Sequence, residues 1–157
     1  MDTTALERML DDAFDHAVVH HGYADHMRDY EVIVHMTADP RTGVAPAYLR
    51  YLFRFCVEAR CETSVPAAVW KDSLDDRLIA REPGADLDGY VWGVRWHALC
   101  PGARLVPESD AARRWSEALG IDFHEVHIRT TAHDLTLVFS ELQVDEVPVG
   151  YAPFVAD

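Results

Sequence analysis

The sequence has 157 residues, of which 49% are hydrophobic, with 14 basic and 27 acidic side chains and a formal net charge of −13. This length and hydrophobicity exclude a disordered chain and predict one globular domain over residues 1–157, with an irregular tail from about residue 145. The charge disfavours nucleic-acid binding and favours a basic partner. We see neither a signal peptide nor an apolar run of the roughly 20 residues that cross a bilayer, so we expect a cytoplasmic protein without a membrane partner.

Residues 6–20 have the periodicity of an amphipathic helix that ends at Gly22. Its apolar stripe would consist of Leu6, Met9, Leu10, Ala13, Phe14 and Ala17. On the same helix Asp12, His16 and His20 would share a face, and two histidines one turn apart can share a zinc ion. A solvated polar face explains the spacing more simply because no remote ligand is evident, so we assign no metal.

Two alternating stretches predict neighbouring antiparallel strands over residues 30–37 and 51–62. The second stretch directs these residues to one buried face: Tyr51, Phe53, Phe55, Val57, Ala59 and Cys61. Large aromatic side chains dominate the energetics of protein cores, so this strand is expected near the middle of a sheet.

The following residues predict a helix from about 66 to 79, a loop over 81–86 and an aromatic strand over 88–100. Residues 104–106 predict a short edge strand. Ser109 and Gly120 have the properties of the two caps of a third helix.

The last predicted element is a hairpin with strands over 123–130 and 135–144, a turn over 131–134 and an irregularity near Ser140. The tail would be irregular and held by Tyr151 and Phe154. Together the elements predict an α+β fold in which a mainly antiparallel sheet of five or six strands carries about three helices on one face.

Polar residues of the strands are candidates for a binding site on the open face of this sheet. The candidates are His35, Arg54, Glu58, Arg60, Arg95 and His97, beside Glu31 and joined by either His124 or the set Glu125, His127 and Arg129. Such a face could bind a small ligand or support catalysis. The competing interpretation is a solvated face stabilised by cross-strand charge pairs, and the sequence favours it.

A second candidate surface is acidic. Its residues are Asp72, Asp75, Asp76, Asp86 and Asp88. They would form either a docking surface for a basic protein or a solubilising helix face and loop.

The three cysteines, Cys56, Cys61 and Cys100, do not form a metal-binding motif. Cys56 would share a face with Arg54 and Arg60, which makes it the best candidate for a reactive thiol. A small buried side chain is the favoured interpretation of Cys56. No complete catalytic or cofactor motif is present, so we assign no catalytic residue and no cofactor, and we favour a binding protein over an enzyme.

Several strings resemble the YxiG-like family of uncharacterised bacterial proteins, and the resemblance covers most of the chain, from about residue 17 to residue 142. They are DYE from Asp29, LRYLFR from Leu49, WKDSLDDRLI from Trp70, DLDGYVWGV from Asp86 and LGIDFHEV from Leu119. Members of this family are thought to lie near secreted polymorphic toxins in some bacteria. The resemblance therefore implies an immunity or interaction protein, and it provides no catalytic residues.

The sequence leads to two hypotheses of different classes, with self-association as a third. The first is a small acidic bacterial protein that binds another protein, such as a basic toxin that it neutralises. The second is a small-ligand binder or enzyme that uses the His/Arg/Glu sheet face, which requires a concave pocket there. A homo-oligomer formed through a sheet edge or exposed aromatic residues is the third.

Overall fold

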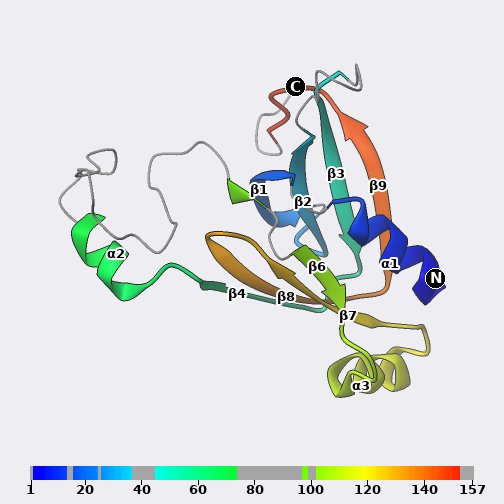
Figure 1. Cartoon of the computed structure of the whole chain (residues 1–157). Coiled ribbons are helices and arrows are strands. Elements are labelled where there is room, and N and C mark those ends of the chain that lie inside the picture. The colour runs from blue at the N-terminus through cyan, green and yellow to red at the C-terminus, as the bar shows by residue number, and fades with distance from the viewer. Residues whose placement is uncertain are drawn as a thin grey trace.

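The computed structural model describes residues 2–13, 16–24, 26–36, 45–73, 97–98 and 102–152. These residues form two antiparallel sheets (Figure 1). The five-stranded sheet contains, in spatial order, β5 (His97–Ala98), β1 (Ala17–Ala24), β2 (Asp29–Met36), β3 (Ala47–Arg54) and β9 (Glu141–Val147). The four-stranded sheet contains, in spatial order, β4 (Glu58–Thr63), β8 (His133–Phe139), β7 (His124–Arg129) and β6 (Gly102–Leu105).

Two of the three described helices pack against strands of the sheets. Helix α1 (Thr3–Asp11) contacts β6, and α3 (Asp110–Leu119) contacts β7 and β8. Helix α2 (Ala67–Ser73) follows β4 and lies away from both sheets (Figure 1). The prediction of one sheet of five or six strands with about three helices packed on one face is therefore wrong, because the strands divide between two sheets.

The strands divide between the two sheets at a corner. Two paired chain segments, residues 54–58 and residues 138–141, both pass through it. Arg54 pairs with Glu141 in the five-stranded sheet, and Glu58 pairs with Val138 in the four-stranded sheet. Residues 55–57 thus lie opposite residues 139–140, and an extra residue on one side bends a strand pair. Phe55 has a positive φ of 51°, and its backbone N–H donates to the Asp29 carboxylate at 2.9 Å. The predicted strand over 51–62 is therefore two strands in two sheets.

The main core lies between the sheets. Phe53 of β3 and Phe139 of β8 meet edge to face with their ring centroids 4.9 Å apart. Leu6 and Leu10 of α1 are buried in the same cluster. Such side chains supply most of the favourable free energy of folding because they remove large apolar areas from water. Tyr51 and Phe53 are buried as predicted, whereas Cys61 on the same predicted face is exposed.

Helix α1 is shorter than the predicted helix over 6–20. It begins after Asp2, whose carboxylate accepts a hydrogen bond from the Thr4 N–H, and it ends at Asp11. Residues 17–24 form β1, so Gly22 lies inside a strand. The β-branched pair Val18 and Val19 favours a strand, and the partners offered by β2 decide the outcome.

Other predicted elements are confirmed. Strand β2 pairs antiparallel with β3, β6 is an edge of its described sheet, and the chain leaves the hairpin at Ser140. Ser109 caps α3 through the Ala112 N–H, and Gly120 ends it with a φ of 72°. The predicted aromatic strand over 88–100 lies outside the described residues except for β5, as does the end of the predicted second helix.

Candidate functional site

The predicted sheet-face residues do not share one face. His35 lies on β2 of the five-stranded sheet, with its ring 4.8 Å from that of Tyr48. Arg54 lies at the corner, where its Nη1 is 3.4 Å from Glu141 Oε2. Glu58 and Arg60 belong to β4 of the other sheet, and Glu58 accepts a hydrogen bond from Trp115 Nε1 at 2.9 Å.

The remaining sheet-face candidates are described in part or not at all. His97 belongs to β5, where it pairs with Val18, and Arg95 lies outside the described residues. Glu31 is fully buried, and the Tyr151 hydroxyl donates to its Oε2 at 3.3 Å, as expected for a tail held by Tyr151. The tail thus contacts Glu31, one of the polar residues of the five-stranded sheet.

The register of β7 places Glu125, His127 and Arg129 on the face of the four-stranded sheet that points away from the core. We call this the outer face; it also carries Arg60, Arg104, Asp134 and Thr136. A cavity of about 460 Å³ is lined there by Arg104, His127 and Arg129 among others. His127 Nε2 is 3.2 Å from Glu125 Oε1, and Arg129 Nε is 3.3 Å from Asp134 Oδ1. Such exposed pairs contribute about 0–1 kcal/mol to stability.

The acidic candidates cannot be assembled into a surface from the described residues. Asp72 belongs to α2, whereas Asp75, Asp76, Asp86 and Asp88 lie outside the described residues. The acidic docking surface on this segment therefore stays a prediction.

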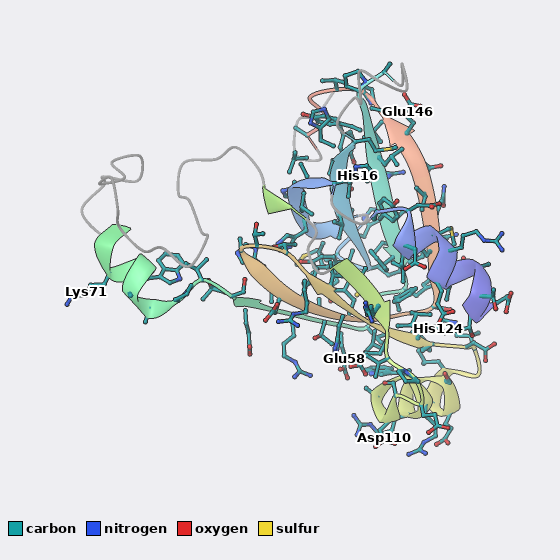
Figure 2. The ribbon with its side chains drawn as sticks, in the orientation of Figure 1. His16, Glu58, Lys71, Asp110, His124 and Glu146 are labelled. Carbon is teal, nitrogen blue, oxygen red and sulfur yellow. The ribbon has the colours of Figure 1, made fainter. Side chains whose placement is uncertain are left out.

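A larger hollow lies between the first and third helices. This α1–α3 groove has a volume of about 860 Å³ and is lined by residues of α1, β6, α3, β7 and the turn before α3. Its apolar lining comes from Leu10, Ala103, Leu105, Val106, Pro107, Ala112 and Phe123. Figure 2 labels His124 on the β7 wall and Asp110 at the start of α3.

Charge in the groove is mainly negative. Four carboxylates line it, those of Glu7, Asp11, Glu108 and Glu125, against the two guanidinium groups of Arg104 and Arg113. Arg113 is 2.6 Å from Asp110, so its charge is already paired. The Ser109 hydroxyl donates a short hydrogen bond to Glu125 and positions that carboxylate.

His124 adds a polar group to the groove wall without adding charge at neutral pH. Burial lowers the pKa of His124 below its ordinary value, although Asp122 opposes the shift. Its Nε2 atom is buried and has no hydrogen-bond partner among the described residues. This part of the groove wall is therefore uncharged and desolvated.

A compact cluster of histidine and cysteine lies between the two sheets. His21 comes from β1, Cys61 from β4 and His133 from β8, and one ligating atom of each lies within 4.8 Å of the others. His21 Nε2 is 3.0 Å from His133 Nδ1, and His21 Nδ1 is 2.8 Å from the Tyr30 hydroxyl. This His21–Cys61–His133 cluster differs from the predicted set of Asp12, His16 and His20, which do not share a helix.

Two members of the cluster, His21 and Cys61, are uncharged at neutral pH because burial shifts their pKa values. Burial, followed by the neighbouring His133 and His20, lowers the pKa of His21 to about 4. Burial, followed by Asp134 and Glu62, raises the pKa of Cys61. Cys56 lies elsewhere in the core, where burial raises its pKa to about 12, which agrees with a small buried side chain rather than a reactive thiol.

Comparison with known proteins identifies the family of the chain. The sequence model of the YxiG-like protein family matches residues 2–157. The chain belongs to the YxiG-like family. This confirms the resemblance seen in the sequence, and the family description specifies no activity.

One enzyme is similar to part of the chain. Asparagine synthetase (glutamine-hydrolyzing) 2 of Oryza sativa subsp. japonica is 31% identical over 93 residues, which cover 56% of this YxiG-like chain and 16% of that enzyme. The chain thus matches about one sixth of the length of this relative. No solved structure matches the chain significantly. Among the described residues, no helix is both long and apolar enough to cross a bilayer.

Proposed function

We propose that this YxiG-like protein is a protein-binding module whose α1–α3 groove receives a basic segment of its partner. The observation that carries the proposal is the lining of the groove, in which four carboxylates surround an apolar floor. Complementary charge speeds association and selects the partner, whereas apolar contact supplies most of the affinity. The formal net charge of −13 acts in the same direction.

The size of the groove supports an extended peptide segment as the occupant. Its volume of about 860 Å³ lies at the upper end of the range for ordinary ligand pockets. A segment with alternating basic and apolar side chains would place its cations beside Glu7 and Glu108.

The experiment measures binding of a fluorescent peptide of about ten alternating Arg and Leu residues by anisotropy. Glu7→Lys and Glu108→Lys should each weaken binding by roughly tenfold, which corresponds to about 1.4 kcal/mol. Glu146→Lys makes the same charge change on β9, outside the groove lining, and should change affinity by less than about threefold. If Glu146→Lys weakens binding as much as the groove variants, net charge alone explains binding and the proposal fails.

The narrower form of the proposal is an immunity protein that neutralises a basic toxin. An acidic inhibitor can cover a basic substrate surface by matching its electrostatic potential. Coexpression with a basic toxin encoded beside the gene should restore growth, and Glu7→Lys should abolish that protection while Glu146→Lys retains it. Protection that survives Glu7→Lys would exclude the groove as the neutralising surface.

A second candidate function is binding of a small anion at the outer face. The cavity of about 460 Å³ brings Arg104, His127 and Arg129 together, and the Arg104 side chain is exposed there. Arginine binds phosphate and carboxylate groups through two parallel N–H donors. Calorimetry with inorganic phosphate should detect binding that Arg104→Ala removes, and an absence of heat at millimolar phosphate would exclude this candidate.

A further inference from the structure

The structure brings together three metal-ligating side chains that are far apart in the sequence. His21 and His133 are 112 residues apart, yet their ring nitrogens Nε2 and Nδ1 are separated by 3.0 Å. Cys61 offers its Sγ to the same space. We propose that His21, Cys61 and His133 bind one Zn²⁺ ion, with a fourth coordination position open to water.

The atomic separations fit tetrahedral zinc after small side-chain movements. Zinc–nitrogen bonds of about 2.0–2.1 Å and zinc–sulfur bonds of about 2.3 Å place neighbouring ligand atoms roughly 3.3–3.6 Å apart. The two ring nitrogens of the cluster are 3.0 Å apart, and all three ligating atoms lie within 4.8 Å of one another. Side-chain rotations that move these atoms by about 1 Å therefore reach the required geometry without a change of backbone.

The backbone positions two of the ligands on one face of the four-stranded sheet. Cys61 pairs with Leu135 and Thr63 pairs with His133, so Cys61 and His133 are diagonal neighbours across β4 and β8. His133 is further held by the turn before it, where its N–H donates to Thr130 Oγ1 at 2.8 Å. Leu135, on the same face, is buried in the core, so this face points toward the five-stranded sheet and His21.

A hydrogen bond prepares His21 to act as a ligand. Its Nδ1 lies 2.8 Å from the Tyr30 hydroxyl, which can accept the Nδ1 proton and leave the Nε2 lone pair for a metal. Metal-binding histidines commonly have such a partner, which orients the ring. Tyr30 is therefore a positioning residue, and it acts through His21.

The chemistry of the three atoms selects the ion. Two imidazole nitrogens and one thiolate suit Zn²⁺, whereas Mg²⁺ and Ca²⁺ prefer oxygen ligands. Binding releases the thiol proton of Cys61 to solvent, and Cys61 is exposed, so both the ion and the proton have a path. With three protein ligands, the fourth position belongs to water, as in open zinc sites.

A bound ion would join the two sheets. His21 belongs to the five-stranded sheet, and the other two ligands belong to the four-stranded sheet. Zinc should therefore stabilise the folded chain, and at a concentration 100 times its Kd the melting temperature should rise by roughly 5–10 °C. The site is separate from the α1–α3 groove, so it does not rest on the proposed function.

The experiment titrates Zn²⁺ alone into the reduced full-length protein after a chelator has been removed. We expect one ion per chain with a Kd below about 1 µM, a stoichiometry and affinity typical of a built zinc site. Cobalt substitution should produce the intense visible bands of tetrahedral Co²⁺ with a thiolate–cobalt charge-transfer band. Magnesium should produce neither heat nor a rise in melting temperature.

The decisive variant is Cys61→Ser because the Cys61 side chain is exposed and its replacement leaves the core intact. Zinc affinity should fall at least about 100-fold, and the thiolate–cobalt band should vanish. His133→Gln should weaken binding similarly. Tyr30→Phe should weaken it by about 10–100-fold, with the cobalt spectrum retained, as expected of a positioning residue.

The matched control is His26→Asn, which removes an exposed histidine at a φ of 63° that asparagine tolerates. It should leave stoichiometry, affinity and spectrum unchanged. The proposal is overturned if wild-type protein binds no zinc at 10 µM, or if Cys61→Ser retains wild-type affinity. Binding of the Arg–Leu peptide that persists in chelator would separate a failure here from a failure of the groove.

Discussion

The α1–α3 groove and the His21–Cys61–His133 cluster lie toward opposite edges of the four-stranded sheet. They differ in how strongly a small displacement of atoms should affect binding. The groove is wide and combines an apolar floor with four carboxylates, so small shifts of single atoms should change its affinity little. The cluster holds three atoms within 4.8 Å, and a shift of about 1 Å decides whether it can bind an ion. Strands alone supply the compact site, whereas two helices, two strands and the turn before α3 line the broad one.

The largest expected effect comes from a substitution in the core, which should destabilise both regions together. Phe139 packs against Phe53 at 4.9 Å and lies 6.0 Å from the ring of His124 on the groove wall. Phe139→Ala should lower the free energy of unfolding by about 3–5 kcal/mol in urea denaturation, because it removes a fully buried ring. Phe139→Leu should lower the free energy of unfolding by less than half as much. A decrease below about 1 kcal/mol for Phe139→Ala would contradict a core shared by the two regions.

The next largest effect is the pH dependence of stability, which should depend on His21 of the cluster and not on the groove. The pKa of His21 is lowered from 6.5 to about 4 in the folded chain, so the unfolded chain binds more protons between these values. Stability from His21 is therefore complete above pH 6.5 and is lost as pH falls toward 4. In chelator, we expect a loss of about 1–3 kcal/mol over this range after allowance for partial solvent exposure.

The measurement is a series of urea denaturations from pH 7 to pH 4. His21→Gln should flatten the pH dependence, whereas His127→Gln, which removes an exposed histidine on the outer face, should preserve it. Parallel curves for wild type and His21→Gln would show that His21 does not control acid stability.

The smallest effect should be confined to the groove. Ser109 caps α3 by accepting a hydrogen bond from the Ala112 N–H at 3.1 Å, and it also donates to Glu125. Ser109→Ala should destabilise the protein by about 1 kcal/mol and accelerate amide exchange in the first turn of α3. Ser109→Thr keeps the cap and should be close to wild type. Altered zinc affinity in Ser109→Ala would contradict the independence of the two regions.

Local signals in the sequence predicted those elements whose structure depends on local residues. Ser109 and Gly120 mark the ends of α3 because caps satisfy backbone groups within a few residues. The alternation of β2 and β3 was visible because one face of each strand points into the core.

The corner between the sheets was not predictable in this way. Alternation continues through residues 51–62 although the chain turns at Phe55, because a bulge changes direction without interrupting an apolar pattern. The end of α1 differs from the prediction for a related reason. Residues 6–17 fit a helical period, but pairing with β2 places residues 17–24 in a strand.

The cluster between the sheets could not be predicted because its members come from three strands. From the sequence alone, His21 follows a predicted helix, Cys61 points toward the predicted core and His133 lies in a predicted turn, so no spacing connects them. The adjacent histidines His20 and His21 were the available signal, and only the pairing of β1 with β2 places His21 beside Tyr30. The groove depends likewise on the contact between α1 and β6, which joins distant parts of the chain.

The corner also has a consequence for how the chain folds. Strands β3 and β4 pair across it with β9 and β8, so residues 47–63 pair with residues 133–147. These pairings must close a loop of about 70 residues before either sheet is complete, whereas β1, β2 and β3 can pair locally. We therefore expect the β1–β2–β3 meander to form early and the arrival of β8 and β9 to limit the folding rate. Because the same two segments build both sheets, neither sheet can persist alone, and the molecule should unfold in one cooperative transition.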